Sequence, residues 1–234
     1  MKAVILAGGF GKRLRPLTED KPKPLVEICG KPIIEFQIDY LKSFGVNEIV
    51  VLAGYRWDRL IERLGSGKRL GVNIVYVVED EPLGTGGALR HAKPVLSREE
   101  AFIVMNGDIV TNIDVTRLYK KVLSRDNVYA GVALVPMKSP YGVVKVKGDY
   151  VLEFIEKPLL KEYLINAGIY VLKPKALDYM PEKGDLEKTA FPRLAREGRM
   201  IAEVYSDAFW KSIDTVKDLE EAEELLREKG LCRS

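Results

Sequence analysis

The chain has 234 residues and a formal net charge of +3, from 37 lysines and arginines against 34 aspartates and glutamates. This near balance argues against a general nucleic-acid-binding protein, and no apolar run approaches the length needed to span a bilayer. The chain has two cysteines, far apart in sequence, and one histidine, so we expect neither a disulfide framework nor a zinc site. Because it opens without a basic leader segment and cleavage site, we expect a soluble, cytoplasmic protein.

The first half of the chain alternates strands with helices. Four short segments rich in valine and isoleucine have the pattern of strands buried on both faces of a parallel sheet. They are residues 2–7, 48–53, 72–79 and 101–105. Helices are expected at residues 32–44, 57–64 and 85–95. This alternation predicts an α/β fold with a doubly wound, mostly parallel, Rossmann-like sheet that binds ligands at the carboxyl ends of its strands.

After Asp108 the pattern changes to strands with little helix between them. The expected strands are residues 129–135, 142–146, 151–156 and 165–172, with a hairpin turn at residues 147–150. Two helices follow, at residues 186–197, where Pro192 interrupts or kinks the helix, and at residues 216–229. We therefore divide one compact domain into a lobe of residues 1–112 and a smaller mixed α+β lobe of residues 113–234.

A glycine-rich loop follows the first strand, where Leu6 to Thr18 read L-A-G-G-F-G-K-R-L-R-P-L-T. Glycine tolerates positive φ and has no Cβ, so backbone N–H groups around Gly8, Gly9 and Gly11 can approach an anion closely. The same region carries cations that repel one another unless they lie in solvent or share a polyanion. These cations are Lys12, Arg13, Arg15, Lys21 and Lys23. The loop therefore predicts a phosphate-binding site.

Two common phosphate-binding loops do not match. The dinucleotide fingerprint G-x-G-x-x-G would need a glycine at Leu14 and a helix where Pro16 stands. The NTPase loop G-x-x-x-x-G-K-[ST] does not occur. Ala53-Gly54 stands where a dinucleotide-dependent oxidoreductase has an acidic ribose-binding residue, so we discount that activity.

The loop instead resembles the sugar-phosphate nucleotidylyltransferases, whose pattern is L-A-G-G-x-G-x-R-L-x-P-L-T followed by K-P-x-P. Four later segments agree as well, and the resemblance covers the chain from residue 2 to about residue 226. They are E-P-L-G-T-G-G-A from Glu81, N-G-D from Asn106, E-K-P from Glu156 and N-A-G from Asn166. The resemblance implies an enzyme that transfers a nucleotidyl group from an NTP to a sugar 1-phosphate with Mg²⁺. The hexapeptide repeat that some relatives append is absent, so no acyltransferase activity is expected.

The resemblance also implies roles for single residues. Arg13 should hold the β- and γ-phosphates and the leaving pyrophosphate, and Lys23 should bridge the α-phosphate and the attacking phosphate. Asp108, at a strand end, should bind Mg²⁺, which takes one or two carboxylates plus substrate phosphates. A helix cap is the alternative for Asp108. Most relatives have a second acid in W-x-D-x-G-T; this chain reads W-K-S-I-D-T from Trp210, so we assign Asp214 as second metal ligand, with a structural role as its rival.

The lobe of residues 1–112 is expected to bind the nucleotide. Its expected contacts, with Arg13 and Asp108, are Leu6, Ala7, Gly8, Gly9, Gly11, Lys12, Glu79, Gly84 and Thr85. Glu79 stands where uridylyl- and thymidylyl-transferring members commonly have a glutamine. A carboxylate only accepts hydrogen bonds, and guanine offers two adjacent donors, so Glu79 favours GTP; a solvated strand end is the alternative.

The lobe of residues 113–234 is expected to bind the sugar phosphate, through Gly142, Glu156, Lys157 and Asn166. The segment around Glu79 resembles mannose-1-phosphate guanylyltransferases, so mannose 1-phosphate is the first choice of sugar. Thymidylyl, uridylyl or cytidylyl transfer to glucose 1-phosphate or a related sugar stays open. A non-catalytic nucleotide-sugar-binding subunit would be expected to lack Arg13, Lys23 or Asp108. The oligomeric state is left open, a homo-oligomer included.

Overall fold

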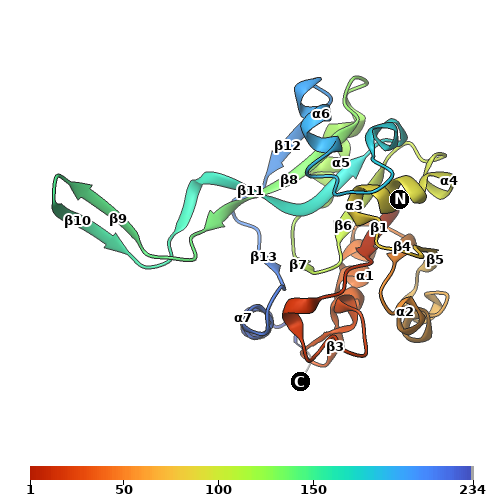
Figure 1. Ribbon diagram of the computed structural model, residues 1–234, viewed down its shortest axis with the longest axis horizontal. Helices are drawn as coiled ribbons and strands as arrows, with labels where there is room; N and C mark the ends of the chain where they lie inside the picture. Colours follow the sequence, from red (N-terminus) through yellow and green to blue (C-terminus); the bar gives the residue numbers. More distant parts are fainter. Residues whose placement is uncertain (233–234) are drawn as a thin grey trace.

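A computed structural model describes residues 1–232. Its centre is a seven-stranded sheet (Figure 1) in the order β12 (Met200–Val204), β8 (Ala130–Lys138), β11 (Leu159–Leu172), β6 (Phe102–Asn106), β1 (Lys2–Ala7), β4 (Glu48–Ala53) and β5 (Asn73–Val78). The strands pair in parallel except at β11, which runs antiparallel to β6 and β8. The prediction of a mostly parallel α/β sheet is confirmed. Within the described residues, no helix is both long and apolar enough to cross a membrane.

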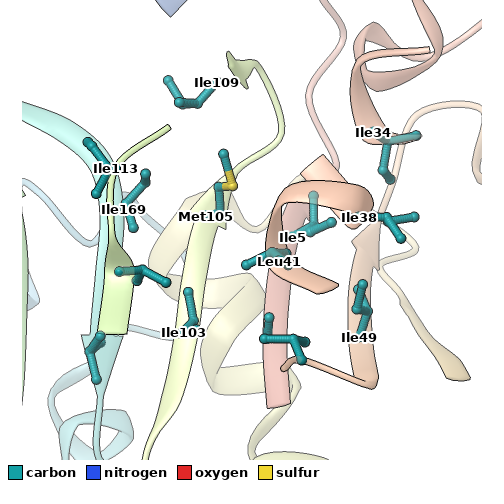
Figure 2. Close-up of a cluster of buried hydrophobic side chains, with 14 of the residues drawn as sticks. Ile5, Ile34, Ile38, Leu41, Ile49, Ile103, Met105, Ile109, Ile113 and Ile169 are labelled. Atoms are coloured by element: carbon teal, nitrogen blue, oxygen red, sulfur yellow. The ribbon is translucent and has the colours of Figure 1, made fainter. Parts of the chain in front are cut away.

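Helices cover both faces of the sheet. On one face lie α1 (Ile33–Ser43), α2 (Trp57–Leu64) and α5 (Val115–Leu123). On the other lie α3 (Gly84–His91), α4 (Lys93–Leu96) and α6 (Ala190–Arg196). Strand β1 supplies both cores, because successive side chains point to opposite faces: Ile5 packs against α1 (Figure 2), and Val4 packs on the opposite face.

Several helix boundaries differ from expectation. The helix expected at residues 85–95 is two helices, α3 and α4, because Pro94 has no N–H with which to continue a helix. The region after Asp108, where mainly strands were expected, also contains the helix α5, which sequence reasoning missed. Asp114 caps this helix by accepting a hydrogen bond from Thr116 N at 3.0 Å. The helix expected from residue 186 begins at Ala190, so Pro192 lies in its first turn, where proline is tolerated and no kink is needed.

The C-terminal part returns to the glycine-rich loop. Strand β13 (Trp210–Ser212) pairs antiparallel with β7 (Ile109–Thr111), and α7 (Val216–Glu228) packs beside the small β2–β3 hairpin (Glu27–Ile28 and Lys31–Pro32). Leu226 of α7 shares an apolar cluster with Leu14 and Ile28. The β13–β7 ladder therefore brings together residues about 100 positions apart, and the apolar cluster brings together residues about 200 positions apart.

Cys29 and Cys232 form a disulfide, with their Cα atoms 5.5 Å apart. The expectation that the chain has no disulfide is therefore wrong. The two cysteines are separated by 203 positions, and the packing of α7 against the β2–β3 hairpin brings them together. No local sequence pattern reports such a long-range contact.

A β-hairpin projects from the body of the molecule, at the left of Figure 1. It consists of β9 (Val143–Lys147) and β10 (Tyr150–Ile155), joined by the turn expected there. We call residues 139–158 the arm; Ser139 N donates to Pro158 O at 2.9 Å across its base. Every residue from 144 to 157 is exposed. The arm thus extends the β8–β11 ladder away from the sheet, and residues 144–157 contribute to none of the buried apolar clusters described above.

Candidate functional site

The glycine-rich loop turns away from the end of β1 in a conformation that needs its glycines. Gly11 has φ of +61°, and a Cβ there would lie 3.0 Å from Thr18 Cγ2 and 3.1 Å from Lys23 Cβ. Thr18 Oγ1 also donates to Gly11 O at 2.9 Å. A larger residue at position 11 would therefore separate the loop from Lys23.

Lys23 lies between two carboxylates. Its Nζ is 2.6 Å from Asp108 Oδ2 and 2.9 Å from Asp214 Oδ1, and its side chain is 14% exposed. Arg13 Nη2 donates to the same Asp214 oxygen at 2.8 Å. The Arg13 side chain is 71% exposed, so its guanidinium is accessible to an incoming anion. Two cations and two acids thus converge beside the glycine-rich loop.

Asp108 stands between β6 and β7. Gly107 N donates to Leu6 O at 3.0 Å, and a Cβ at Gly107 would lie 2.4 Å from that oxygen, so the approach to β1 requires glycine. The Oδ1 atom of Asp108 is buried and has no hydrogen-bond partner. The alternative role as a helix cap is excluded, because β7 follows Asp108 and Asp114 caps the next helix.

Asp214 lies between β13 and α7. Ile213 N donates to Asp108 O at 2.9 Å, which extends the β13–β7 pairing and places the two acids side by side. Thr215 then begins α7 in a reciprocal capping box with Asp218. Burial alone would raise the pKa of Asp214, but hydrogen bonding and charge from Lys23, with the charge of Arg13, lower it below its ordinary value.

These groups line a cavity of about 310 Å³ at the carboxyl ends of β1 and β6. Its lining residues include Leu6, Ala7, Gly9, Gly11, Lys12, Arg13, Lys23, Asp108 and Asp214. The structure therefore brings together the predicted phosphate-binding and metal-binding residues from three distant parts of the chain.

A second cavity, of about 320 Å³, shares Leu6, Gly9 and Asp108 with the first. It also contains the remaining predicted nucleotide contacts, which are Gly8, Glu79, Gly84 and Thr85. Burial raises the pKa of Glu79, and a hydrogen bond from Leu83 N at 3.2 Å opposes that rise only in part. A Cβ at Gly8 would lie 2.5 Å from Glu79 Oε1, so the glycine leaves room for the carboxylate.

Asn106 and Phe10 are among the residues of the second cavity that sequence reasoning missed. Asn106 Oδ1 is buried there without a hydrogen-bond partner. The Phe10 ring, partly exposed at the same cavity, lies 5.2 Å from the Tyr55 ring. The available signal for Asn106 was its position at the end of a buried strand, next to Gly107 and Asp108.

The four residues expected to bind the sugar phosphate are not all at these cavities. Asn166 donates to Tyr170 Oη at 2.8 Å and accepts from Gly168 N at 2.9 Å, and Gly168 packs against Asn106 of the second cavity. In contrast, Gly142, Glu156 and Lys157 lie on or beside the arm strands and appear in the lining of neither cavity. Three of the four residues expected to bind the sugar phosphate therefore lie away from the cavities that contain the predicted phosphate-binding residues.

Comparisons with known proteins identify the family of the chain. Residues 2–229 match the nucleotidyl transferase family. The chain is 39% identical over 228 residues to the mannose-1-phosphate guanylyltransferase catalytic subunit beta of Dictyostelium discoideum and 40% identical over 226 residues to a probable mannose-1-phosphate guanylyltransferase 2 of Oryza sativa. Each alignment covers 93% of this chain and 62% of the relative, so the chain spans about three fifths of these curated relatives.

Two solved structures are similar over nearly their whole length. HddC from Yersinia pseudotuberculosis has a TM-score of 0.76 at 31% identity, covering 96% of this chain and 99% of that one. A putative glucose-1-phosphate thymidylyltransferase from Bacillus anthracis has a TM-score of 0.79 at 26% identity, covering 97% and 96%. The match over residues 2–229, together with the glycine-rich loop and its strand-end acids, shows that the chain belongs to the nucleotidyl transferase family.

Proposed function

We propose that this chain transfers a nucleotidyl group from an NTP to a sugar 1-phosphate, which yields an NDP-sugar and pyrophosphate. The observation that carries the proposal is the position of Lys23 Nζ between Asp108 and Asp214, with Arg13 on the same acid, beside the glycine-rich loop. Fixed cations and strand-end carboxylates are the groups that phosphoryl transfer requires, because catalysis there is mainly positioning and charge neutralisation.

The reaction exchanges one P–O bond for another. An oxygen of the sugar phosphate forms a bond to the α-phosphorus, and the bond from that phosphorus to the bridging oxygen of pyrophosphate breaks. In this proposal Lys23, whose Nζ contacts Asp108 and Asp214, binds both the α-phosphate and the attacking phosphate. Arg13, which is exposed, is suited to exchange its contact with Asp214 for the β- and γ-phosphates and so stabilise the charge of the leaving group.

The acids fit a hard divalent cation. Within residues 1–232 no group of three or more His, Cys, Asp or Glu side chains could hold a metal ion, but Mg²⁺ commonly uses one or two carboxylates and completes its coordination with phosphates and water. Asp108 and Asp214 supply such a pair, and the orphaned Oδ1 of Asp108 lacks a partner that a cation would provide. A bound Mg²⁺ would neutralise negative charge on the phosphates.

We propose GTP and mannose 1-phosphate as the substrates. The Dictyostelium and Oryza relatives are named mannose-1-phosphate guanylyltransferases, and a second structure of HddC, 30% identical to this chain, is described as complexed with GMP-PN. Glu79 lies in the second cavity, where its carboxylate can accept from the adjacent N1–H and N2–H₂ groups of guanine. Thymidylyl transfer, suggested by the name of the Bacillus relative, is less compatible with Glu79, since thymine presents one donor between two acceptors.

A matrix of five nucleotides against several sugar 1-phosphates, read by pyrophosphate release with Mg²⁺, tests this proposal. We expect GTP with mannose 1-phosphate to be the best pair. Lys23→Met should reduce its turnover by about 10²–10³-fold, as for loss of one group that stabilises transition-state charge. Lys21→Met is the matched control, because Lys21 lies two residues before Lys23 but lines a different cavity. Absence of pyrophosphate release from every pair would refute the proposal.

A further inference from the structure

Gln37 places a polar amide on the buried face of α1. The residue is 1% exposed, and Ile33, Ile34 and Leu41, three or four positions away along the helix, are fully buried. Ile34 and Leu41 belong to the apolar cluster drawn in Figure 2. Residues at this spacing share one face of a helix, so the pattern of α1 favours an apolar side chain at position 37. The glutamine found there is the exception on this face.

The amide of Gln37 donates both of its N–H groups to one turn. Its Nε2 atom donates to Asn106 O at 2.7 Å and to Ile109 O at 3.0 Å. Asn106 ends β6 and Ile109 begins β7, so the two carbonyl groups stand on either side of Gly107 and Asp108. An amide nitrogen has two N–H groups. Every donor of this side chain is therefore used at the turn that carries Asp108.

The oxygen of the same amide has no partner. Gln37 Oε1, Asn106 Oδ1 and Asp108 Oδ1 are the buried side-chain polar atoms without a hydrogen bond among residues 1–232. A reversed amide would place its oxygen against two carbonyl oxygens, so the hydrogen bonds decide its orientation. A buried acceptor without a partner is unfavourable, and methionine or leucine at position 37 would avoid it. The contribution that offsets this cost is the pair of hydrogen bonds to the turn.

Three parts of the chain hold the backbone of this turn. Gln37 of α1 holds its two ends. Gly107 N donates to Leu6 O of β1 at 3.0 Å, and Asp108 O accepts from Ile213 N at 2.9 Å. The contacts of Leu6 and Ile213 are made by backbone atoms, whereas those of Gln37 are made by a side chain. A substitution at position 37 can therefore remove one support of the turn and leave the other two in place.

We infer that Gln37 is a positioning residue for the proposed metal-binding acid. By fixing the carbonyl groups of Asn106 and Ile109, its amide holds the intervening Asp108 where the carboxylate meets Lys23 and a divalent cation. Gln37 appears in the lining of neither cavity of the candidate site, so it acts through Asp108 and not by contact with the substrates. The inference rests on the proposed function, which gives Asp108 its role.

Gln37→Met tests the inference, because methionine has a similar length and volume but no donor. The affinity for GTP is measured by calorimetry without a sugar phosphate, once with Mg²⁺ and once with EDTA. In EDTA the variant should bind GTP as the wild type does, because the glycine-rich loop and Glu79 are unchanged. The gain in affinity on adding Mg²⁺ should shrink about tenfold or more, and half-maximal turnover should require about 10–100-fold more Mg²⁺, as for loss of a group that orients a metal ligand.

Glu35→Gln is the matched control on the same helix. The Glu35 side chain is 6% exposed, and its Oε1 atom lies 2.8 Å from Arg63 Nε and 2.7 Å from Arg69 Nη2, away from the turn. This variant loses charged contacts, so its midpoint of thermal unfolding should fall, but it should keep the wild-type gain in GTP affinity on adding Mg²⁺. Gln37→Asn is a second test variant: it keeps the amide, but it is one methylene too short to reach both carbonyl groups, so it should lose the same gain.

The outcomes separate positioning from a purely structural role. A folded Gln37→Met protein with the wild-type gain from Mg²⁺ would overturn the inference. An equal loss of GTP affinity in EDTA and in Mg²⁺ would overturn it as well, since a structural defect weakens both, and so would failure of both Gln37 variants to fold. A wild-type protein that binds GTP with Mg²⁺ but releases no pyrophosphate with any sugar 1-phosphate would contradict the proposed function alone. A wild-type protein that binds no nucleotide would contradict both.

Discussion

Reduction of the Cys29–Cys232 disulfide should lower the free energy of unfolding by about 2–5 kcal/mol. The cross-link joins positions 203 residues apart. In the chain-entropy description, closing a loop of this length removes about 5 kcal/mol of conformational freedom from the unfolded state at 25 °C, and real disulfides often deliver less. The folded state should change little, since Leu226 and Ala222 of α7 stay buried and Cys29 N donates to Glu223 Oε1 at 2.9 Å.

The assay is thermal unfolding of the oxidised protein with and without dithiothreitol. For a chain of this size, the expected loss corresponds to a decrease of about 5–15 °C in the midpoint. Turnover at 25 °C should be retained, because Asp214 lies at the other end of α7, where the capping box and the β13–β7 pairing hold it. The double variant Cys29→Ser with Cys232→Ser is the control and should not respond to reductant. Equal midpoints for the oxidised and reduced protein would refute this reasoning.

Two further predictions concern the site. Gly107→Ala places a Cβ 2.4 Å from Leu6 O and should destabilise the protein by about 1–3 kcal/mol in urea unfolding. The control is Gly9→Ala, whose Cβ would meet nothing within 4 Å and which should leave the free energy of unfolding within about 0.5 kcal/mol of wild type. Equal effects of the two substitutions would contradict the steric account. Because burial raises the pKa of Glu79, its carboxylate ionises at a higher pH than an ordinary glutamate, so the kcat/KM ratio of GTP over UTP should rise with pH through that raised pKa. Glu79→Gln should flatten this dependence, and a pH-independent ratio in the wild type would remove Glu79 from base recognition.

Local patterns predicted the structure of the first half of the chain well. β1, β4 and α2 begin and end where expected, because buried apolar runs and helix boundary signals depend on neighbouring residues alone. The glycine-rich loop was predictable for the same reason, since Gly8, Gly9 and Gly11 lie within four positions of one another. The strand-end rule then identified Asp108 before its surroundings were known.

Long-range pairing accounts for what the sequence did not reveal. Asp214 reaches Asp108 through the β13–β7 ladder, and the sequence indicated only that the acid had shifted along its segment. The disulfide depends on the packing of α7, which brings Cys232 to Cys29 although the two cysteines are 203 positions apart. The arm strands were expected, but their projection from the sheet depends on the antiparallel β8–β11 pairing, which brings together residues that local patterns treat separately.

The roles assigned to all the predicted site residues stay predictions, as does the cytoplasmic location. For Asn166, the hydrogen bonds to Tyr170 and Gly168 give the role a structural context.

The central claim is that Asp108 and Asp214 act together beside Lys23. Turnover of Asp108→Ala and Asp214→Ala, measured across a range of Mg²⁺ concentrations, tests it most directly. The account predicts that each variant loses at least about 10²-fold in turnover and requires more Mg²⁺ than the wild type. An Asp214→Ala protein with near-normal turnover and unchanged dependence on Mg²⁺ would contradict it.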